Sequence, residues 1–371
     1  MELTADLILT GGRVATLDPA RPHATALAIR NGRIMAVGGD EVAGLAGPGT
    51  RMVDLGGRAV MPGLIDSHTH GLWGACRDLY EVFPGLGAPL QAVLDGIAAR
   101  AAKVAAGTWI IAGPWRPFDR PGFGPRPAEM LDRIAPDHPV AIKDVSQHNL
   151  WLNTAALRVA GITRDTADPA GGVIERDASG SPTGILIEAA GALVQGFLEP
   201  TAAELDAAVG HLSTYFHGLG ITGFKEPMAF APELAAYAKA DRAGRLNLRV
   251  GAHLTRFSPF SEDWVPMEAL AALRAAHQGP HLNTGFAKLF LDGVPIARTA
   301  AFHAPYPGHE AAPHDPEAML LVKPDRLAEE LIALDGAGYV VKMHAVGDRA
   351  VQAGLDAIAA ARVANGPSGL R

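Results

Sequence analysis

Hydrophobic and polar positions form short alternating runs through the first 60 residues, and glycine-containing turns separate them. Such runs are typical of β-strands. Asn31-Gly32 between two of them predicts a tight hairpin turn. Because a few strands leave one face uncovered, we expect residues 1–60 to be one part of a small β-sandwich that takes partner strands from elsewhere in the chain. The predicted strands are 7–9, 12–17, 26–29 and 33–37.

From residue 61 the pattern changes to apolar strands that alternate with alanine-rich helices. This alternation is typical of parallel βα units, so we expect an α/β fold, an incomplete TIM (β/α)8 barrel over residues 61–371. The predicted strands are 63–66, 220–224, 248–252, 286–290 and 339–343, and the clearest helices are 201–219, 231–244 and 348–364.

A long segment separates the first two predicted barrel strands, far more than the roughly dozen residues that a simple crossover needs. Its middle is rich in proline and glycine, and residues 171–176 and 182–186 read as strands joined by a polar turn at 177–180. We therefore expect an inserted subdomain over about residues 75–200, placed to cover a barrel mouth.

The first barrel strand, which we expect to be buried, runs into His68 and His70. Side chains alternate along a strand, so the two histidines face one way, and their imidazoles can converge on one metal ion at about 2.0 to 2.1 Å. Composition alone predicts about 0.5 such pairs by chance, so the placement after a strand gives the motif its weight. The alternative is a pair of hydrogen-bonded structural histidines.

His344 follows the apolar strand 339–343 and stands where a barrel presents its functional face. We expect it to be a third metal ligand, and the alternative is a structural role.

Lys288 lies inside the apolar run 286–291, where a lysine is rarely found without a partner. A desolvated lysine has a lowered pKa, and reaction with carbon dioxide would make it an anionic oxygen ligand able to bridge two metals. The alternative is an ion pair with Asp292 or Glu226, and Lys225 is a rival for the ligand role.

Three further residues are candidates for substrate binding. His148 stands in the predicted insert, within reach of a barrel mouth, and its alternative role is structural. Trp73 follows the histidine pair and is expected either to wall a pocket or to join the core. Asp292, directly after the run that holds Lys288, is the third candidate.

Composition excludes several classes of protein. The net charge is −7 without a basic stripe, so we expect no nucleic-acid partner. The single cysteine, Cys76, rules out an internal disulfide framework and fits a reducing compartment. The sequence has neither a signal-peptide pattern nor a stretch of about 18 to 20 apolar residues, so we expect a cytoplasmic protein with no membrane partner. We also expect its substrate to be a small molecule. Homo-oligomerisation is left open.

Five ordered segments together resemble the amidohydrolase superfamily, most closely the amidohydrolase family 3 branch that includes enzymes similar to N-substituted formamide deformylases. The resemblance covers nearly the whole chain. The matching segments are residues 9–14, 62–70, 147–153, 288–293 and 344–351.

The resemblance implies a distorted TIM barrel beside a β-sandwich, with one or two divalent metal ions, zinc above all, at the barrel mouth. It implies that His68 and His70 are first-strand ligands, Lys288 a carbamylated fourth-strand ligand and His344 a fifth-strand ligand. The implied reaction is hydrolysis of an amide or formamide C–N bond by metal-activated water, which gives an amine and a carboxylic acid.

The chain departs from the family pattern in one respect. The family continues with a sixth-strand histidine and an eighth-strand aspartate that acts as general base, and we expect both beyond Arg371. No catalytic base is therefore assigned, and we expect a truncated chain that is inactive as these 371 residues. The alternatives are a deaminase or cyclic-amide hydrolase on the same site, or a non-catalytic metal-binding fragment.

Overall fold

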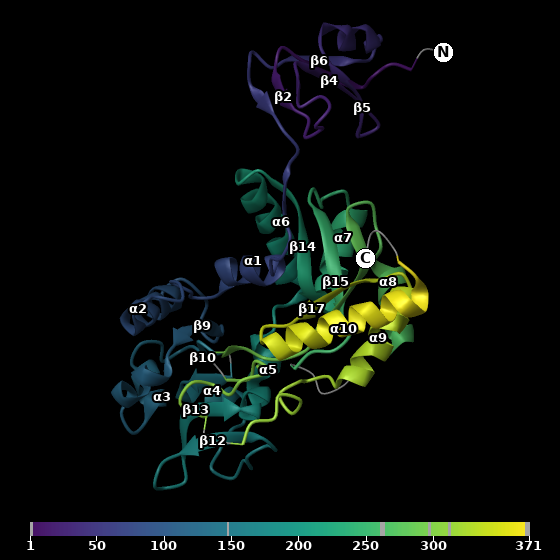
Figure 1. The fold of residues 1–371 in the computed structure, drawn as a ribbon. Coiled ribbons are helices and arrows are strands. Elements are labelled where there is room, and N and C mark those ends of the chain that lie inside the picture. The colour runs from purple at the N-terminus through teal and green to yellow at the C-terminus, as the bar shows by residue number, and fades with distance from the viewer. Residues whose placement is uncertain (1–2, 147, 260–263, 296–297, 311–312, 368–371) are drawn as a thin grey trace. The chain divides into compact units, whose positions relative to one another are not determined.

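The computed structural model divides the chain into two compact units (Figure 1). One comprises Met1–Ile65 with Gly220–Thr222, and the other comprises Asp66–Leu219 with Gly223–Arg371. The residues that the structure describes are 3–146, 148–259, 264–295, 298–310 and 313–367.

The first unit holds two small sheets, with strand orders β5-β4-β1-β6 and β3-β2-β7. All four predicted strand runs are confirmed, and Asn31 and Gly32 turn the β4–β5 hairpin with φ of 50° and 70°. Buried Ile8, Ala28 and Val42 form its core. Its elements are β1 (Leu7–Thr10), β2 (Arg13–Ala15), β3 (His23–Ala24), β4 (Ala26–Arg30), β5 (Arg33–Gly38), the 3-10 helix Asp40–Leu45, β6 (Arg51–Asp54) and β7 (Ala59–Val60).

A five-stranded sheet, in the order β17-β16-β15-β14-β8, contains every predicted barrel strand, and β14 to β17 pair in parallel. Helices follow the strands in βα alternation, as a TIM barrel requires. The strands are β8 (Leu64–Asp66), β14 (Ile221–Ala229), β15 (Arg249–Thr255), β16 (Leu282–Phe290) and β17 (Val340–His344), and the helices are α6 (Ala202–Gly218), α7 (Ala231–Arg242), α8 (Met267–His277), α9 (Pro324–Gly336) and α10 (Asp348–Asn365).

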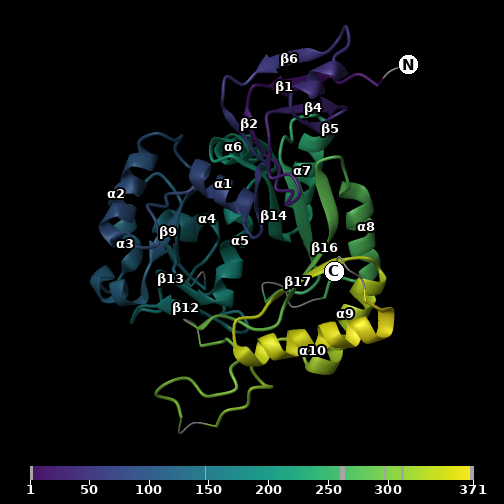
Figure 2. The same ribbon diagram turned by 45° about the horizontal axis from the view of Figure 1, so that its top comes forward.

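The sheet is curled (Figure 2). β8 and β17 are its two edge strands, yet the Lys342 ammonium of β17 donates a hydrogen bond to the Ser67 carbonyl, just past β8, at 2.7 Å. Because a flat sheet of five strands would hold its edges far apart, this bond shows that the carboxyl ends of the strands converge. The sheet is therefore part of a TIM barrel, as predicted.

The expectation that the strand before His68 is buried is wrong. Leu64 is 50% exposed and Ile65 is 70% exposed. The physical reason is that β8 is an edge strand, so its apolar side chains lack a neighbouring strand on one side.

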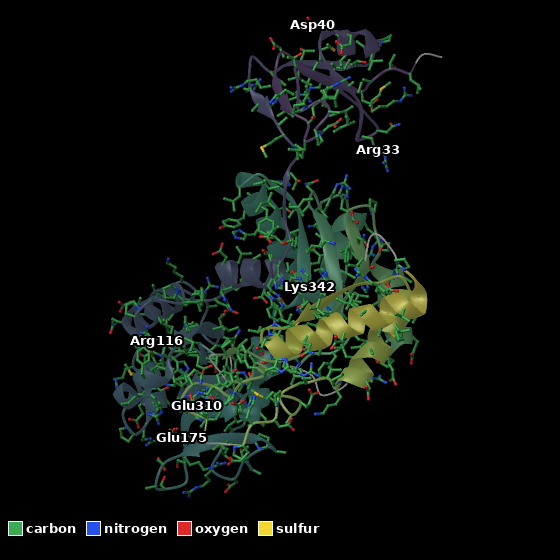
Figure 3. The ribbon with its side chains drawn as sticks, in the orientation of Figure 1. Arg33, Asp40, Arg116, Glu175, Glu310 and Lys342 are labelled. Atoms are coloured by element: carbon green, nitrogen blue, oxygen red, sulfur yellow. The ribbon has the colours of Figure 1, made fainter. Side chains whose placement is uncertain are left out.

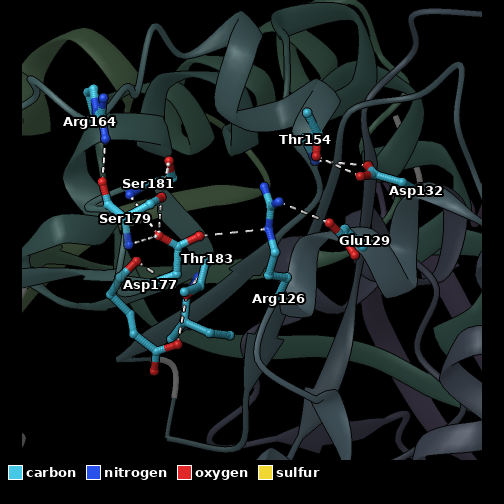
Figure 4. Close-up of polar contacts among 11 residues, drawn as sticks. Arg126, Glu129, Asp132, Thr154, Arg164, Asp177, Ser179, Ser181 and Thr183 are labelled. Atoms are coloured by element: carbon cyan, nitrogen blue, oxygen red, sulfur yellow. Dashed lines mark hydrogen bonds and ion pairs between the residues drawn. The ribbon is translucent and has the colours of Figure 1, made fainter.

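The segment between β8 and β14 forms a second sheet, in the order β12-β13-β11-β10-β9, around a core that includes Trp151 and Ile142. The predicted strands 171–176 and 182–186 are confirmed as β12 and β13. Asp177 shapes the turn between them by accepting the amides of Ser179 and Ser181 at 2.8 and 3.0 Å (Figure 4). The elements of this segment are α1 (Gly71–Tyr80), α2 (Leu90–Ala101), β9 (Ile110–Trp115), the 3-10 helix Pro117–Phe123, α3 (Pro127–Asp132), β10 (Val140–Asp144), β11 (Asn149–Leu152), α4 (Thr154–Val159), β12 (Gly172–Arg176), β13 (Pro182–Glu188), the 3-10 helix Ala189–Gly191 and α5 (Ala192–Leu198).

None of the helices in the described part of the chain combines the length and the apolar character needed to cross a membrane.

Candidate metal centre

His68 and His70 lie in the turn that joins β8 to α1. The Asp66 carboxylate accepts a hydrogen bond from the backbone amide of His68 at 2.9 Å. A hydrogen bond from the Thr69 side chain, together with the one from the His68 amide, holds the pKa of Asp66 below its usual range. The two imidazole centroids are 5.8 Å apart, with ring planes at 80°. Burial and the positive charges of two nearby lysines lower the pKa of His68, which favours the neutral, metal-binding form of the ring.

Trp73 supports the second histidine. Its indole stacks on the His70 imidazole at 5.3 Å between centroids and donates from Nε1 to the Glu233 carboxylate at 3.2 Å. Trp73 is 39% exposed, so it forms a wall beside His70 that solvent reaches on one side. A contact between Trp73 and substrate stays a prediction.

Glu226 is a buried carboxylate behind His70. Its Oε2 accepts the Tyr237 hydroxyl at 3.1 Å and the Leu72 amide at 3.4 Å. Its Oε1 lies 3.6 Å from His70 Nδ1, just beyond hydrogen-bond distance, and both atoms are buried without a hydrogen-bond partner among the described residues. Burial raises the pKa of Glu226, while His70 beside it acts in the opposite direction.

A carboxylate that faces one ring nitrogen of a histidine leaves the other nitrogen for a metal, and such pairs commonly orient metal ligands. Glu226 entered the sequence reasoning only as an alternative partner for Lys288. The sequence feature that could have pointed to Glu226 as a buried carboxylate is an acidic residue within an apolar strand.

His253 of β15 was missed from the sequence. Its ring is buried, Nδ1 lies 2.8 Å from the Glu226 carbonyl oxygen, and burial lowers its pKa to about 3. The imidazole is therefore neutral at physiological pH. The sequence feature that could have pointed to His253 is a histidine within an apolar run, directly after Ala252.

Lys288 points from β16 into the curled sheet and is 2% exposed. Its ammonium lies 4.5 Å from the Phe290 ring centroid, and burial, helped by the charge of Lys342, lowers its pKa to about 8. The alternative ion pairs with Asp292 and Glu226 are not found among the described residues. The neutral amine is thus accessible near physiological pH, and carbamylation stays a prediction.

The rival Lys225 has its ammonium 3.3 Å from the Phe286 ring centroid.

His344 ends β17, one strand from Lys288. Its Nε2 lies 3.1 Å from the Gly293 carbonyl, and donation there leaves Nδ1 as the nitrogen able to bind metal. The ring stacks on Phe290 at 5.1 Å between centroids.

Asp292 is fully buried next to His344. Its carboxylate accepts the amides of Ala301, Val346 and Gly347 at 3.0, 3.0 and 2.8 Å. These bonds tie together the loops after β16 and β17, which is a structural role. The predicted contact between Asp292 and substrate stays a prediction.

His148 lies in the inserted segment, and its predecessor Gln147 lies outside the described residues. The His148 ring is exposed and its Nδ1 is 2.8 Å from the Glu188 carboxylate. Its predicted role in substrate binding stays a prediction.

The donor chemistry around the histidine pair fits a divalent metal. The two imidazoles are close together, His70 Nδ1 has no hydrogen-bond partner among the described residues, and the charge of Lys288 acts on His68. Across the described part of the chain, no group of three or more His, Cys, Asp and Glu side chains converges closely enough to hold an ion.

Comparison with known proteins decides the family. A model described as the amidohydrolase family matches residues 51–371. The chain belongs to this family. Among curated proteins, it is 32% identical to Protein LONG AFTER FAR-RED 3 of Arabidopsis thaliana, over 98% of this chain and 63% of that protein. It is 30% identical to the putative amidohydrolase YtcJ of Bacillus subtilis, over 94% of this chain and 65% of that one.

The N-substituted formamide deformylase of Arthrobacter pascens is 34% identical over 65% of this chain and 46% of its own length. The chain thus spans less than two thirds of several of its amidohydrolase relatives. Among solved structures, an uncharacterized metal-dependent hydrolase from Pyrococcus furiosus has a TM-score of 0.70 at 25% identity, over 96% of this chain and 70% of that one. The family is therefore the amidohydrolase family, and the fold is similar to that of a metal-dependent hydrolase.

Proposed function

We propose that the chain is a metal-dependent hydrolase that cleaves a non-peptide C–N bond, of an amide or a formamide, in a small-molecule substrate. The observation that carries this proposal is that His68, His70, Lys288 and His344 all stand at or just past the carboxyl-terminal part of strands β8, β16 and β17, which belong to one curled sheet. In barrels of this class that end is where catalysis takes place. The similarity to a formamide deformylase supports the type of bond.

The four residues would hold one or two divalent ions, zinc above all. His70 would bind through Nε2 while Glu226 fixes its ring, and His344 would bind through Nδ1 while the Gly293 carbonyl fixes its ring. A divalent metal at this position supplies Lewis acidity, which polarises a carbonyl and lowers the pKa of water.

Lys288 would bind as a carbamate. Its neutral amine nitrogen attacks the carbon of carbon dioxide, a new N–C bond forms as one C=O π bond opens, and the displaced proton passes to solvent. The lowered pKa of Lys288 makes the neutral amine available for this step.

The test supplies zinc to the purified chain and measures release of amine and formate from a panel of N-substituted formamides. Metal-dependent release that is lost in His68→Ala would support the proposal and overturn the prediction that these 371 residues are inactive. Release of ammonia would assign deamination, and ring opening without a released amine would assign a cyclic-amide hydrolase. Stoichiometric zinc with no turnover would favour a non-catalytic metal-binding chain.

A further inference from the structure

Tyr237 of α7 lies behind the carboxylate that faces His70. Its side chain is fully buried, and its hydroxyl donates a hydrogen bond to Glu226 Oε2 at 3.1 Å. Burial raises the pKa of Tyr237 well above its ordinary value, so the hydroxyl keeps its proton at physiological pH and can donate. The ring packs edge-on against Phe224 at 6.2 Å between centroids. The packing of the ring therefore holds the hydroxyl in one place.

The two oxygens of Glu226 have different surroundings. Oε2 accepts hydrogen bonds from the Tyr237 hydroxyl at 3.1 Å and from the Leu72 amide at 3.4 Å. Oε1 has no hydrogen bond among the described residues and lies 3.6 Å from His70 Nδ1. The bond from Tyr237 is the shorter of the two, so it has the larger part in fixing the rotation of the carboxylate. It thereby fixes the direction in which Oε1 points.

The backbone of the turn that holds His70 has a contact that does not involve Tyr237. The ammonium of Lys342, which Figure 3 labels, donates to the Ser67 carbonyl at 2.7 Å. Loss of the Tyr237 hydroxyl would leave this contact in place.

The His70 ring also has a second support. Trp73 stacks on it at 5.3 Å between centroids, and Trp73 Nε1 donates to the Glu233 carboxylate at 3.2 Å. Glu233 and Tyr237 are four residues apart on α7, so they lie on the same face of the helix. Because the stack does not use the Tyr237 hydroxyl, it should survive in Tyr237→Phe. That variant therefore separates the orientation of Glu226 from the packing of the ring.

We propose that Tyr237 is a positioning residue that acts on His70 through Glu226. A carboxylate held at Nδ1 favours the neutral imidazole that carries its proton on Nδ1, and this tautomer leaves the Nε2 lone pair for a metal. Tyr237 would thus determine which nitrogen of His70 is free to bind. The link to metal binding rests on the proposed function, whereas the effect on the His70 tautomer does not require a metal.

The first arm of the experiment uses the metal-free chain. Long-range ¹H–¹⁵N spectra at about pH 8, where an ordinary histidine is neutral, report which ring nitrogen carries the proton, and His70→Ala identifies the His70 signals. We expect the proton on Nδ1 in the wild type, and a mixture of tautomers in Tyr237→Phe and in Glu226→Gln. Tyr306→Phe is the matched control, because it also loses one hydroxyl bond, to the Ala300 carbonyl at 3.0 Å. It should give the wild-type tautomer.

The second arm measures Co²⁺ affinity by visible absorption. We expect about tenfold weaker binding in Tyr237→Phe and unchanged binding in Tyr306→Phe. The double variant Glu226→Gln/Tyr237→Phe should bind Co²⁺ within about twofold of Glu226→Gln alone, because Tyr237 acts through Glu226.

The proposal is overturned by a wild-type tautomer population in Tyr237→Phe, by wild-type Co²⁺ affinity in that variant, or by losses of affinity that multiply in the double variant. A tautomer that depends on Tyr237 in a chain that binds no Co²⁺ would leave the positioning role standing and overturn the proposed metal site. Far-ultraviolet circular dichroism confirms that each variant is folded. Should Tyr237→Phe not fold, Glu226→Gln decides, since a changed His70 tautomer there supports the proposal and an unchanged one overturns it.

Discussion

The two sides of the candidate site both place a buried carboxylate behind a histidine, yet the two carboxylates are used differently. On the β16–β17 side, Asp292 is saturated by three backbone amides and ties two loops together. On the β8–β14 side, Glu226 keeps one oxygen unpaired and facing His70. The β17 side is therefore fixed by backbone hydrogen bonds, whereas on the β8 side one carboxylate oxygen has no hydrogen bond among the described residues.

The largest effect is expected from Asp292→Ala. Removing this carboxylate leaves three backbone amides unpaired, two of them in the loop after β17, so the free energy of unfolding should fall by about 3 to 5 kcal/mol in urea titrations. Asp356→Ala, an exposed position on α10, is the control and should stay within about 0.5 kcal/mol. Equal stability of the two variants would break the comparison, since Asp292 would not be an anchor.

Lys288→Met should be stabilising at neutral pH. The pKa of Lys288 is lowered from 10.5 to about 8 in the folded state. Burying the charged amine therefore reduces the stability of the fold. This loss of stability is fully present below about pH 8 and disappears as the pH rises past 10.5. In buffer free of carbon dioxide we expect a gain of about 2 to 3 kcal/mol at pH 7. The gain should vanish near pH 11. Unchanged stability at pH 7 would show that an anion already compensates this lysine.

Glu226→Gln should have a smaller effect on stability. Burial raises the pKa of Glu226 in the fold, so the wild type loses stability as the pH rises from about 4.5 through the raised folded-state pKa. The amide still accepts Tyr237 and Leu72, so the variant should lack this pH dependence and be more stable than the wild type at pH 7. Parallel pH profiles for wild type and variant would contradict a buried, pKa-shifted carboxylate.

The smallest effect is expected from Trp73→Phe. The variant keeps an aromatic ring against His70 and loses only the hydrogen bond to Glu233, so thermal unfolding should report a loss of about 0.5 to 1 kcal/mol. A loss several times larger would place Trp73 in the core.

Local patterns predicted much of this architecture. Asn31-Gly32 specified its hairpin, and the residues of α6, α7 and α10 were visible in alanine-rich helical periodicity. His68, His70, Lys288 and His344 could be singled out as candidates because each lies within or directly after an apolar strand run. These signals are short in range, so sequence reasoning reaches them directly.

Features that depend on strand order were missed. Glu226, His253 and Lys342 matter through their neighbours on adjacent strands, and no spacing along the chain reports that Lys342 stands opposite Lys288. The exposure of Ile65 was mispredicted for the same reason, because apolar composition does not distinguish an edge strand from a central one.

We propose that His68 and His70 are the first two ligands of a metal site. Titration of the purified chain with Co²⁺, followed by visible absorption, tests it most directly and needs no turnover. We predict saturable binding in the wild type, at least about 100-fold weaker binding in His68→Ala and His70→Ala, and about 10- to 100-fold weaker binding in Glu226→Gln. Affinity for Co²⁺ that is unchanged in both histidine variants would show that neither histidine binds the metal and would place the metal elsewhere.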